Sequence, residues 1–473
     1  MSEFDKVIGY AAIKQELMQI SDMLKNRSNY EALGAKIPHG ILIHGKPGYG
    51  KTLLAECFIK ESRLKTYTLR KTKRDFAGEI SKAFAEATAN APAIIFLDDM
   101  DKYSDTDRHQ CNAEEYVTIQ SEMDKCRDQD VLVIATANKL YYLPDSLLRD
   151  GRFDRKYKLC PPNEEDSKLI IAHYLEDKNL AADINMDDVL KLFAKKSCAE
   201  IECILNDAAI RAVFNRHDVI VIDDIKEAFL REYFESPDFY VEEDESIRKR
   251  IAAHEAGHLI VAEILNPGSV SIATICDKRV GEKGGFVCQY KKNSLPADDI
   301  IIGLAGKVGE ECCCSDTHYS EWSSSDLSKA YEKFETMIRD DAYCGLQGFY
   351  YDTRNHSPYE IAPESYRTEL DKKIKSEMAY CAACARKILE DNRTLMSEFI
   401  AELQSKQTLL ASDIEQVFKR CHEDVVMWRR EDEFSKKDET RRISWDGSDV
   451  RNERTLRRSV LEELLGDDGR KEA

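Results

Sequence analysis

Short apolar runs alternate with longer amphipathic stretches over residues 1–157. The runs GILIHG, KTYTL, AIIFLDD and DVLVIATAN have the length of buried strands, and helical patterns separate them. Strands that alternate with helices along a chain are typical of a parallel sheet covered by helices. We therefore predict a large α/β domain over residues 1–157.

The hydrophobic period becomes helical after residue 158. Stretches such as DVLKLFAKK and EIECILNDAAIRAVF predict a helical subdomain over 158–232, and the acidic stretch ESPDFYVEEDES predicts a linker over 233–246. A mostly helical domain over 247–428 contains a predicted hairpin, SVSIATI…GGFVCQY, whose first strand we expect to offer an edge to extended peptides. The charge-dense residues 429–473 contain few apolar side chains and are predicted to be disordered.

Composition narrows the classes of function. With 69 basic against 88 acidic residues the net charge is −19, which argues against a general binder of nucleic acid because no excess of Lys and Arg exists. The chain has no signal peptide and no apolar run near the ~20 residues of a membrane span, so we expect a cytoplasmic protein.

Fifteen cysteines without a secretion signal are typical of reduced thiols. The clusters ECCCSD (Cys312, Cys313, Cys314) and CAAC (Cys381, Cys384) are compatible with metal binding or redox sensing. No second cysteine pair follows at the spacing of a zinc finger, so we favour packed thiols.

The stretch GILIHGKPGYGKT has the spacing of a phosphate-binding P-loop. An apolar run precedes Gly45, and Gly50, Lys51 and Thr52 open a helical pattern. Glycines, Gly48 among them, let the backbone N–H groups turn toward phosphate oxygens, while Lys51 reaches the β- and γ-phosphates and Thr52 ligates Mg²⁺. The sequence therefore predicts binding of ATP with Mg²⁺.

Two further strands end in polar residues suited to phosphoryl transfer. Asp98 fits a carboxylate that faces Mg²⁺, and Asp99 fits the residue that polarises the attacking water, which Asn138 would orient. The later stretch LLRDGRFDR offers Arg152 and Arg155 as arginine fingers. Fingers supplied to a neighbouring subunit would require an oligomer.

HEAGH predicts a catalytic zinc site on a helix. Residues four apart share one helix face, so His254 and His258 can bind one ion, and Glu255 can take a proton from water. A catalytic zinc needs a third protein ligand. The residues alone leave this choice open, and the candidates downstream are Glu310, Glu311, Asp316, His318 and Asp326.

Taken together, these motifs resemble those of the FtsH family of AAA+ ATP-dependent zinc proteases. The resemblance runs from Phe4 to the low 420s and rests on FDKVIGYAAIKQEL, GILIHGKPGYGKT, APAIIFLDDMD, LLRDGRFDR, HEAGH and SEWSSSDLSKAYEKF. It implies an α/β ATPase with a helical lid, a homohexameric ring, and Asp326 as the third zinc ligand. It also implies that Phe76 grips the substrate in the central pore.

The sequence departs from this family in three respects. Asp99 stands where the family has Glu, the loop around Phe76 is several residues shorter, and the ATPase module begins almost at Met1, without the usual membrane-spanning region. We expect an ATP-dependent zinc endopeptidase that acts on unfolded or tagged proteins. The alternatives are a remodelling ATPase with a silent peptidase, or a zinc peptidase with a weakly hydrolysing regulatory ring.

Overall fold

A computed structural model describes most of the chain. The described residues are 2–71, 76–103, 114–127, 129–237, 239–278, 284–290, 296–314, 321–340 and 364–428. The predicted tail, 429–473, lies outside them. The structure divides into two compact units, the first formed by Met1–Leu180 and Phe193–Ile225, the second by Ala181–Leu192 and the residues from Lys226 onward.

The first unit is built on a five-stranded parallel sheet of order β2-β3-β4-β1-β5. Its strands are β1 (Gly40–His44), β2 (Lys65–Leu69), β3 (Ala93–Leu97), β4 (Val131–Ala137) and β5 (Arg155–Lys158). The helices of this part are η1 (Glu3–Lys6), α1 (Ala11–Lys25), α2 (Arg27–Glu31), α3 (Lys51–Ser62), α4 (Ala77–Ala89), η2 (Met100–Lys102), α5 (Glu114–Lys125) and η3 (Leu140–Tyr142). The predicted α/β class is confirmed.

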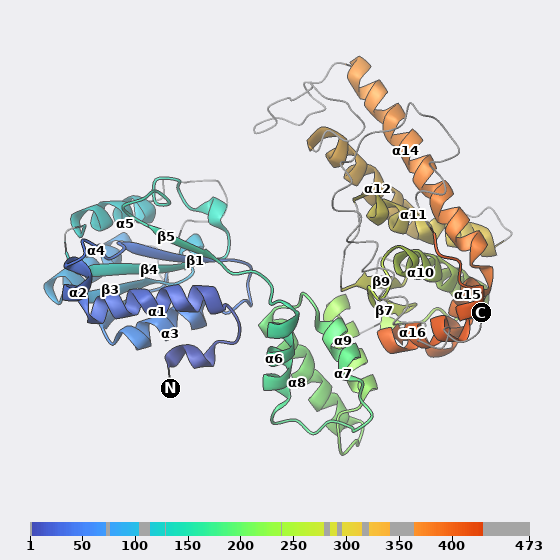
Figure 1. Cartoon of the computed structure of the whole chain (residues 1–473), viewed down its shortest axis with the longest axis horizontal. Helices are drawn as coiled ribbons and strands as arrows, with labels where there is room; N and C mark the ends of the chain where they lie inside the picture. Colours follow the sequence, from blue (N-terminus) through green and yellow to red (C-terminus); the bar gives the residue numbers. More distant parts are fainter. Residues whose placement is uncertain are drawn as a thin grey trace, which may run out of the picture. The chain divides into compact units, whose positions relative to one another are not determined.

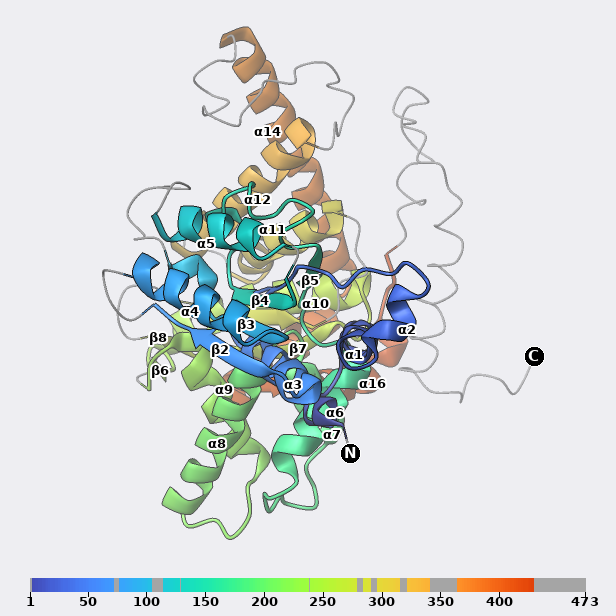
Figure 2. The ribbon, with the colours of Figure 1, turned by 90° about the vertical axis from the view of Figure 1, so that its left-hand side faces the viewer.

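Helices cover both faces of this sheet. In Figures 1 and 2, α1 and α3 lie against one face, and α4 and α5 against the other. The side chains of β3 alternate accordingly: Ile94 and Phe96 pack with α1 and α3, whereas Ile95 and Leu97 pack with α4 and α5. Because both faces are buried, the inner strands β1, β3 and β4 are apolar at nearly every position, whereas the edge strands β2 and β5 carry polar residues.

Four helices follow β5, namely α6 (Glu164–Leu175), α7 (Met186–Phe193), α8 (Cys198–Phe214) and α9 (Ile222–Phe234). The unit boundary differs from the predicted boundary at 232, since residues 181–192 and the part of α9 from Lys226 belong to the second unit. One cause is Asp188 on α7, which accepts hydrogen bonds from the backbone N–H (2.8 Å) and hydroxyl (2.5 Å) of Ser412. The predicted linker also contains a strand, β6 (Phe239–Tyr240).

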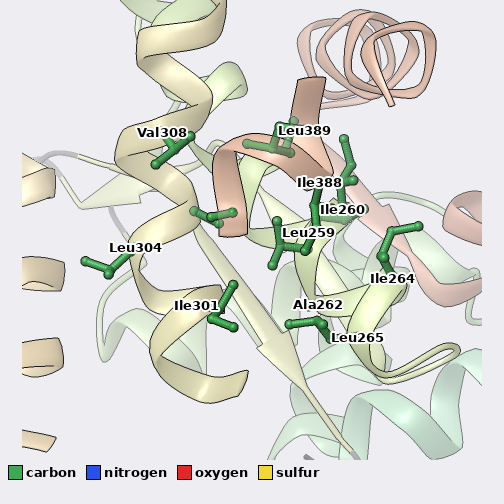
Figure 3. Close-up of a cluster of buried hydrophobic side chains, with 14 of the residues drawn as sticks. Leu259, Ile260, Ala262, Ile264, Leu265, Ile301, Leu304, Val308, Ile388 and Leu389 are labelled. Carbon is green, nitrogen blue, oxygen red and sulfur yellow. The ribbon is translucent and has the colours of Figure 1, made fainter. Parts of the chain in front are cut away.

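The second unit is mostly helical. Its elements are α10 (Glu245–Leu265), β7 (Val270–Thr274), β8 (Asp277–Lys278), β9 (Phe286–Gln289), α11 (Pro296–Cys313), α12 (Glu321–Asp340), α14 (Glu364–Asp391), α15 (Arg393–Lys406), β10 (Thr408–Leu410), α16 (Ala411–Arg420) and η5 (His422–Asp424). Figure 3 shows part of its core, a cluster of buried side chains to which α10 contributes Leu259, α11 Ile301 and α14 Ile388.

The small sheet of the second unit corrects one prediction. Its order is β10-β7-β9, so β7, which contains most of SVSIATI, is paired on both sides. The expectation that this strand offers an edge to a peptide is wrong. The outer strands among the described residues are β9 and β10.

Candidate metal centre and nucleotide site

The glycines of GKPGYGKT adopt backbone conformations that other residues rarely reach. Gly45, Gly48 and Gly50 have φ values of 151°, 80° and 80°. A Cβ at Gly45 would also lie 2.5 Å from the carbonyl oxygen of Leu159, so a side chain there would collide with the backbone. The loop leads directly into α3, whose first N–H groups lack helical partners and can face an anion.

Lys51 and Thr52 open α3 where the predicted roles require them. Lys51 is buried, which lowers its pKa, and its ammonium donates to the carbonyl oxygen of Lys46 at 2.8 Å. The hydroxyl of Thr52 donates to Oδ1 of Asp98 at 3.0 Å. The structure therefore brings the loop after β1 together with the acidic residue after β3, although β4 lies between these two strands.

Hydrogen-bond donors surround the carboxylate of Asp98. Its Oδ1 accepts from Thr52 and, at 2.8 Å, from the hydroxyl of Thr136, while its Oδ2 accepts from the guanidinium of Arg70. Burial alone would raise the pKa of this carboxyl, but the hydrogen bonds from Arg70, Thr136 and Thr52 outweigh it and lower the pKa. The carboxylate is thus ionised and suited to a cation.

Asp99 and Asn138 meet at the same edge of the sheet. The side-chain amide of Asn138 donates to Oδ1 of Asp99 at 3.4 Å, and Lys102 donates to Oδ2 at 2.7 Å. Asp99 has a left-handed backbone with φ of 52°, fixed by an N–H bond to Thr136 Oγ1 at 2.9 Å. The carboxylate predicted to polarise water is therefore held by a neighbouring ammonium in this structure.

The two candidate arginine fingers differ in their surroundings. Arg152 forms hydrogen bonds within its own chain, to both carboxylate oxygens of Asp124 (3.1 and 2.8 Å) and to the carbonyl of Ser146. Arg155, the first residue of β5, is exposed. Of the two, Arg155 is better placed to reach a second chain, because Arg152 would first have to leave Asp124.

The prediction for Phe76 is wrong. Its side chain is 1% exposed and packs edge-on against Tyr103, with ring centroids 4.9 Å apart. Both rings belong to the core between the sheet and the α4–α5 layer. Burying a phenyl ring stabilises a fold by about 1.5–3 kcal/mol, so Phe76 anchors α4 and does not grip a substrate.

The second unit brings both histidines of HEAGH to one point. On α10, His254 and His258 direct their Nε2 atoms toward each other at 3.1 Å, and each lies 3.1 Å from Oδ2 of Asp326 on α12. Ligand atoms about 2.0 Å from one tetrahedral ion would stand about 3.3 Å apart. This is the one group of His, Cys, Asp and Glu with metal-binding geometry among the described residues.

The Nδ1 atoms fix the state of the two imidazoles. The Nδ1–H of His258 donates to the carbonyl oxygen of Ile302 at 2.7 Å, and that of His254 donates to Oε1 of Glu310 at 2.7 Å. With Nδ1 protonated, each Nε2 can offer its lone pair to a cation that lies between it and the carboxylate of Asp326, or carry a proton when no cation is bound. Burial would lower the pKa of His254, but Asp326 and Glu310 raise it to about 10, which shows how strongly this point favours positive charge.

Space for an ion exists because α11 carries a glycine opposite the histidines. A Cβ on Gly306 would lie 2.3 Å from Nε2 of His258 and 2.5 Å from Nε2 of His254. These distances approach the ~2.0–2.1 Å of a zinc–nitrogen bond. The donor set and the space left by Gly306 therefore fit a zinc ion.

Glu255 lies beside this cluster without serving as one of its three members. Its side chain is buried, and its Oε2 has no hydrogen-bond partner among the described residues. Burial raises its pKa. A buried carboxylate oxygen without a donor is costly, so its persistence is typical of a group that acts on a bound water or substrate.

The other candidates for third ligand have different places. Glu310 binds the far side of His254 and also accepts from the hydroxyl of Ser323 at 3.2 Å. Glu311 is exposed and pairs with Arg386. Asp316 and His318 lie outside the described residues.

The cysteine clusters lie in ordinary surroundings. Cys381 and Cys384 are buried in the core of the second unit. Burial raises the pKa of Cys312, and it raises that of Cys313 to about 11, so both thiols stay protonated near neutral pH.

Sequence reasoning missed four residues that touch these sites: Arg70, Thr136, Gly306 and Glu310 in its role as partner of His254. Only Gly306 had a recognisable signal. It belongs to the series Gly303, Gly306, Gly309 in a mostly apolar helical stretch, and glycines inside a helical pattern indicate a close approach of another element.

Comparisons with known proteins bear on both units. Residues 41–161 match the family model described as "ATPase family associated with various cellular activities (AAA)". None of the described helices is long and apolar enough to traverse a lipid bilayer.

Three curated relatives extend the likeness over most of the chain. "ATP-dependent zinc metalloprotease FtsH 2" of Phytoplasma mali is 28% identical, over 92% of this chain and 65% of its own. Proteins named "ATP-dependent zinc metalloprotease FtsH" from Lachnoclostridium phytofermentans and Mycoplasma genitalium are 29% and 28% identical, over 87% and 92% of this chain and 74% and 66% of their own. The chain thus spans about two thirds of the length of these relatives. With the AAA match in the first unit and a likeness that continues through the second, the chain is similar to proteins of the FtsH family over most of its length.

Proposed function

We propose that this protein is an ATP-dependent zinc endopeptidase that unfolds protein substrates, translocates them and cleaves them. The observation that carries the proposal is the convergence of His254, His258 and Asp326 beside a buried Glu255. The relatives' names, which join ATP dependence to zinc proteolysis, support the same assignment.

In the proposed peptidase site, His254, His258 and Asp326 hold the zinc ion. Bound zinc supplies a Lewis acid that polarises the scissile carbonyl. Glu255 accepts a proton from the attacking water and delivers it to the leaving amine nitrogen, a task suited to a carboxylate whose pKa burial has raised. Glu310 keeps the Nδ1 proton of His254 in place, so that Nε2 stays available as a ligand.

In the proposed ATPase site, the N–H groups of residues 45–52 cradle the phosphates, and Lys51 contacts the β- and γ-phosphates. Bound Mg²⁺ neutralises phosphate charge next to Thr52 and Asp98. Asp99 and Asn138 position the attacking water. Arg155 contacts the γ-phosphate of a neighbouring subunit in a homohexamer, and Arg152 joins it after leaving Asp124. The ring feeds unfolded or tagged proteins to the zinc sites.

A specific observation favours a second candidate, a zinc peptidase whose ring hydrolyses ATP slowly. The carboxylate of Asp99 is paired with Lys102 at 2.7 Å and is shorter by one methylene than a glutamate. A displacement of ~1 Å at a reacting centre can cost about a hundredfold in rate. ATP turnover measured beside the cleavage of an unfolded peptide separates the two candidates.

One experiment tests the leading proposal. Degradation of an unfolded model protein is measured with ATP, without ATP and with a zinc chelator, in the parent and in Glu255→Gln. We expect the variant to keep its zinc and its ATP turnover but to lose cleavage, because Glu255 moves the proton and does not bind the ion. Cleavage at the parental rate would refute the assignment.

A further inference from the structure

Arg70 occupies a position at the nucleotide site that the proposed mechanism does not use. It is the first residue after β2, and Asp98 is the first after the neighbouring strand β3. The backbone N–H of Asp98 donates to the carbonyl oxygen of Leu69 at 3.1 Å, which sets the two residues side by side. The guanidinium of Arg70 then reaches the carboxylate of Asp98.

The two oxygens of Asp98 face different partners. Oδ1 accepts from Thr52 and Thr136, which are part of the protein frame, whereas Oδ2 accepts from Arg70. The Asp98 side chain is 1% exposed and that of Arg70 is 64% exposed. The guanidinium thus covers the carboxylate from the solvent side while the rest of the side chain remains in water.

This exposure argues against a role in stability. Asp98 is buried, but the Arg70 side of the pair is open to solvent, so water screens the guanidinium and the long side chain can leave the carboxylate at a lower cost than a buried partner could. The next residue, Lys71, provides the contrast. Its side chain is 17% exposed, and it bonds the carbonyl oxygen of Tyr103 at 2.6 Å and Glu115 at 2.9 Å, as a structural cation does.

The negative charges at the carboxyl ends of the strands indicate what the Arg70 guanidinium does there. Asp98, Asp99 and Asp101 are gathered there, and a nucleotide without Mg²⁺ brings further negative charge. Arg70 neutralises Asp98 and reduces that repulsion. Mg²⁺ requires the same carboxylate, so the guanidinium and the metal compete for it.

We propose that Arg70 is a gating residue of the nucleotide site, which holds Asp98 in the absence of Mg²⁺ and yields it when Mg²⁺ enters with the nucleotide. The residue thereby sets the Mg²⁺ concentration at which the site loads. The proposal rests on the nucleotide-binding function proposed above for Lys51, Thr52 and Asp98.

The test is equilibrium binding of a fluorescent ATP analogue to the full chain, in chelator and over a range of free Mg²⁺. Arg70→Gln should lower the half-saturating Mg²⁺ concentration and weaken Mg²⁺-free binding, each about two- to fivefold, the range that an exposed ion pair allows. Arg70→Lys keeps the charge and should stay within about twofold of the parent in both measurements.

Lys102→Gln is the matched control. Lys102 is 65% exposed and pairs with Asp99 at the same edge, so its loss removes the same charge without freeing Asp98. The change that Lys102→Gln causes in the half-saturating Mg²⁺ concentration measures the electrostatic effect of losing one positive charge near Asp98. This change should be smaller than the one that Arg70→Gln causes. An equal or larger shift for Lys102→Gln, or an unchanged midpoint in Arg70→Gln, overturns the proposal.

A further variant separates this proposal from the function on which it rests. Lys51→Ala should abolish binding of the analogue with or without Mg²⁺. If Lys51→Ala binds as the parent does, the proposed nucleotide site itself is wrong. If Lys51→Ala fails to bind and Arg70→Gln behaves as the parent does, only the role of Arg70 is refuted.

Discussion

Replacing Gly306 by alanine tests the proposed metal centre at its tightest point. The added methyl carbon would lie 2.3 Å from Nε2 of His258 and 2.5 Å from Nε2 of His254. An ordinary contact of this kind measures 3.4 Å or more, so the imidazoles and α11 must separate by about 1 Å. Metal sites tolerate deviations of only about 0.2 Å in their bond lengths. The methyl group also fills the space into which both Nε2 atoms point.

The expected loss of zinc affinity depends on how many ligands the added methyl group displaces. Disturbing one outer partner of a metal ligand costs about 10- to 100-fold in affinity. Because Gly306→Ala displaces two of the three proposed ligands, we expect zinc to bind at least about 100-fold more weakly, or about 2.8 kcal/mol. Peptide cleavage should fall with zinc occupancy, while ATP turnover in the first unit should persist.

The control is one helical turn away. A Cβ at Gly303, also on α11, would meet nothing within 4 Å. Gly303→Ala should therefore leave zinc affinity unchanged and raise the free energy of unfolding by about 0.5–1 kcal/mol, the difference in helix propensity. Zinc affinity is measured by competition with a chelating dye, and stability by thermal unfolding. Parental zinc affinity in Gly306→Ala would refute the assigned metal centre.

Three further predictions concern single side chains. Glu310→Ala should weaken zinc binding about 10- to 100-fold, because the Nδ1–H of His254 loses the carboxylate that fixes its tautomer; unchanged affinity in the dye competition would contradict this role. Asp99→Glu should raise ATP turnover if the shortened carboxylate limits hydrolysis, and a rate equal to or below the parental one in a phosphate-release assay would show that the site is built around aspartate. Arg155→Ala should cut ATP turnover about 10³-fold or more with little loss of nucleotide affinity, as fingers act on the transition state, and a parental turnover would exclude it as a finger.

Local sequence determined the parts of both sites that lie within one loop or one helix. The spacing of GKPGYGKT places three glycines and Lys51 at a strand–helix junction, and HEAGH places two histidines on one helix face because four residues make about one turn. The strands of the first unit were predictable for a related reason. Burial on both faces makes the three inner strands β1, β3 and β4 almost continuously apolar, whatever their order in the sheet, whereas the edge strand β5 (RKYK) gave no such signal.

Only the tertiary structure decided which residues far apart in the sequence come into contact. Asp326 stands 72 residues after His254, and the spacing alone could not distinguish it from Glu310, which packing places behind the same histidine. Phe76 has polar neighbours in the sequence yet is buried against Tyr103, because α4 must cover the sheet. The strand β7 has no free edge because β10 pairs with it, and Thr408 of β10 lies 134 residues after its partner Thr274 of β7. Local patterns report which side chains can share a helix face or a strand, whereas the close approach of α10, α11 and α12 depends on the shape of the whole core.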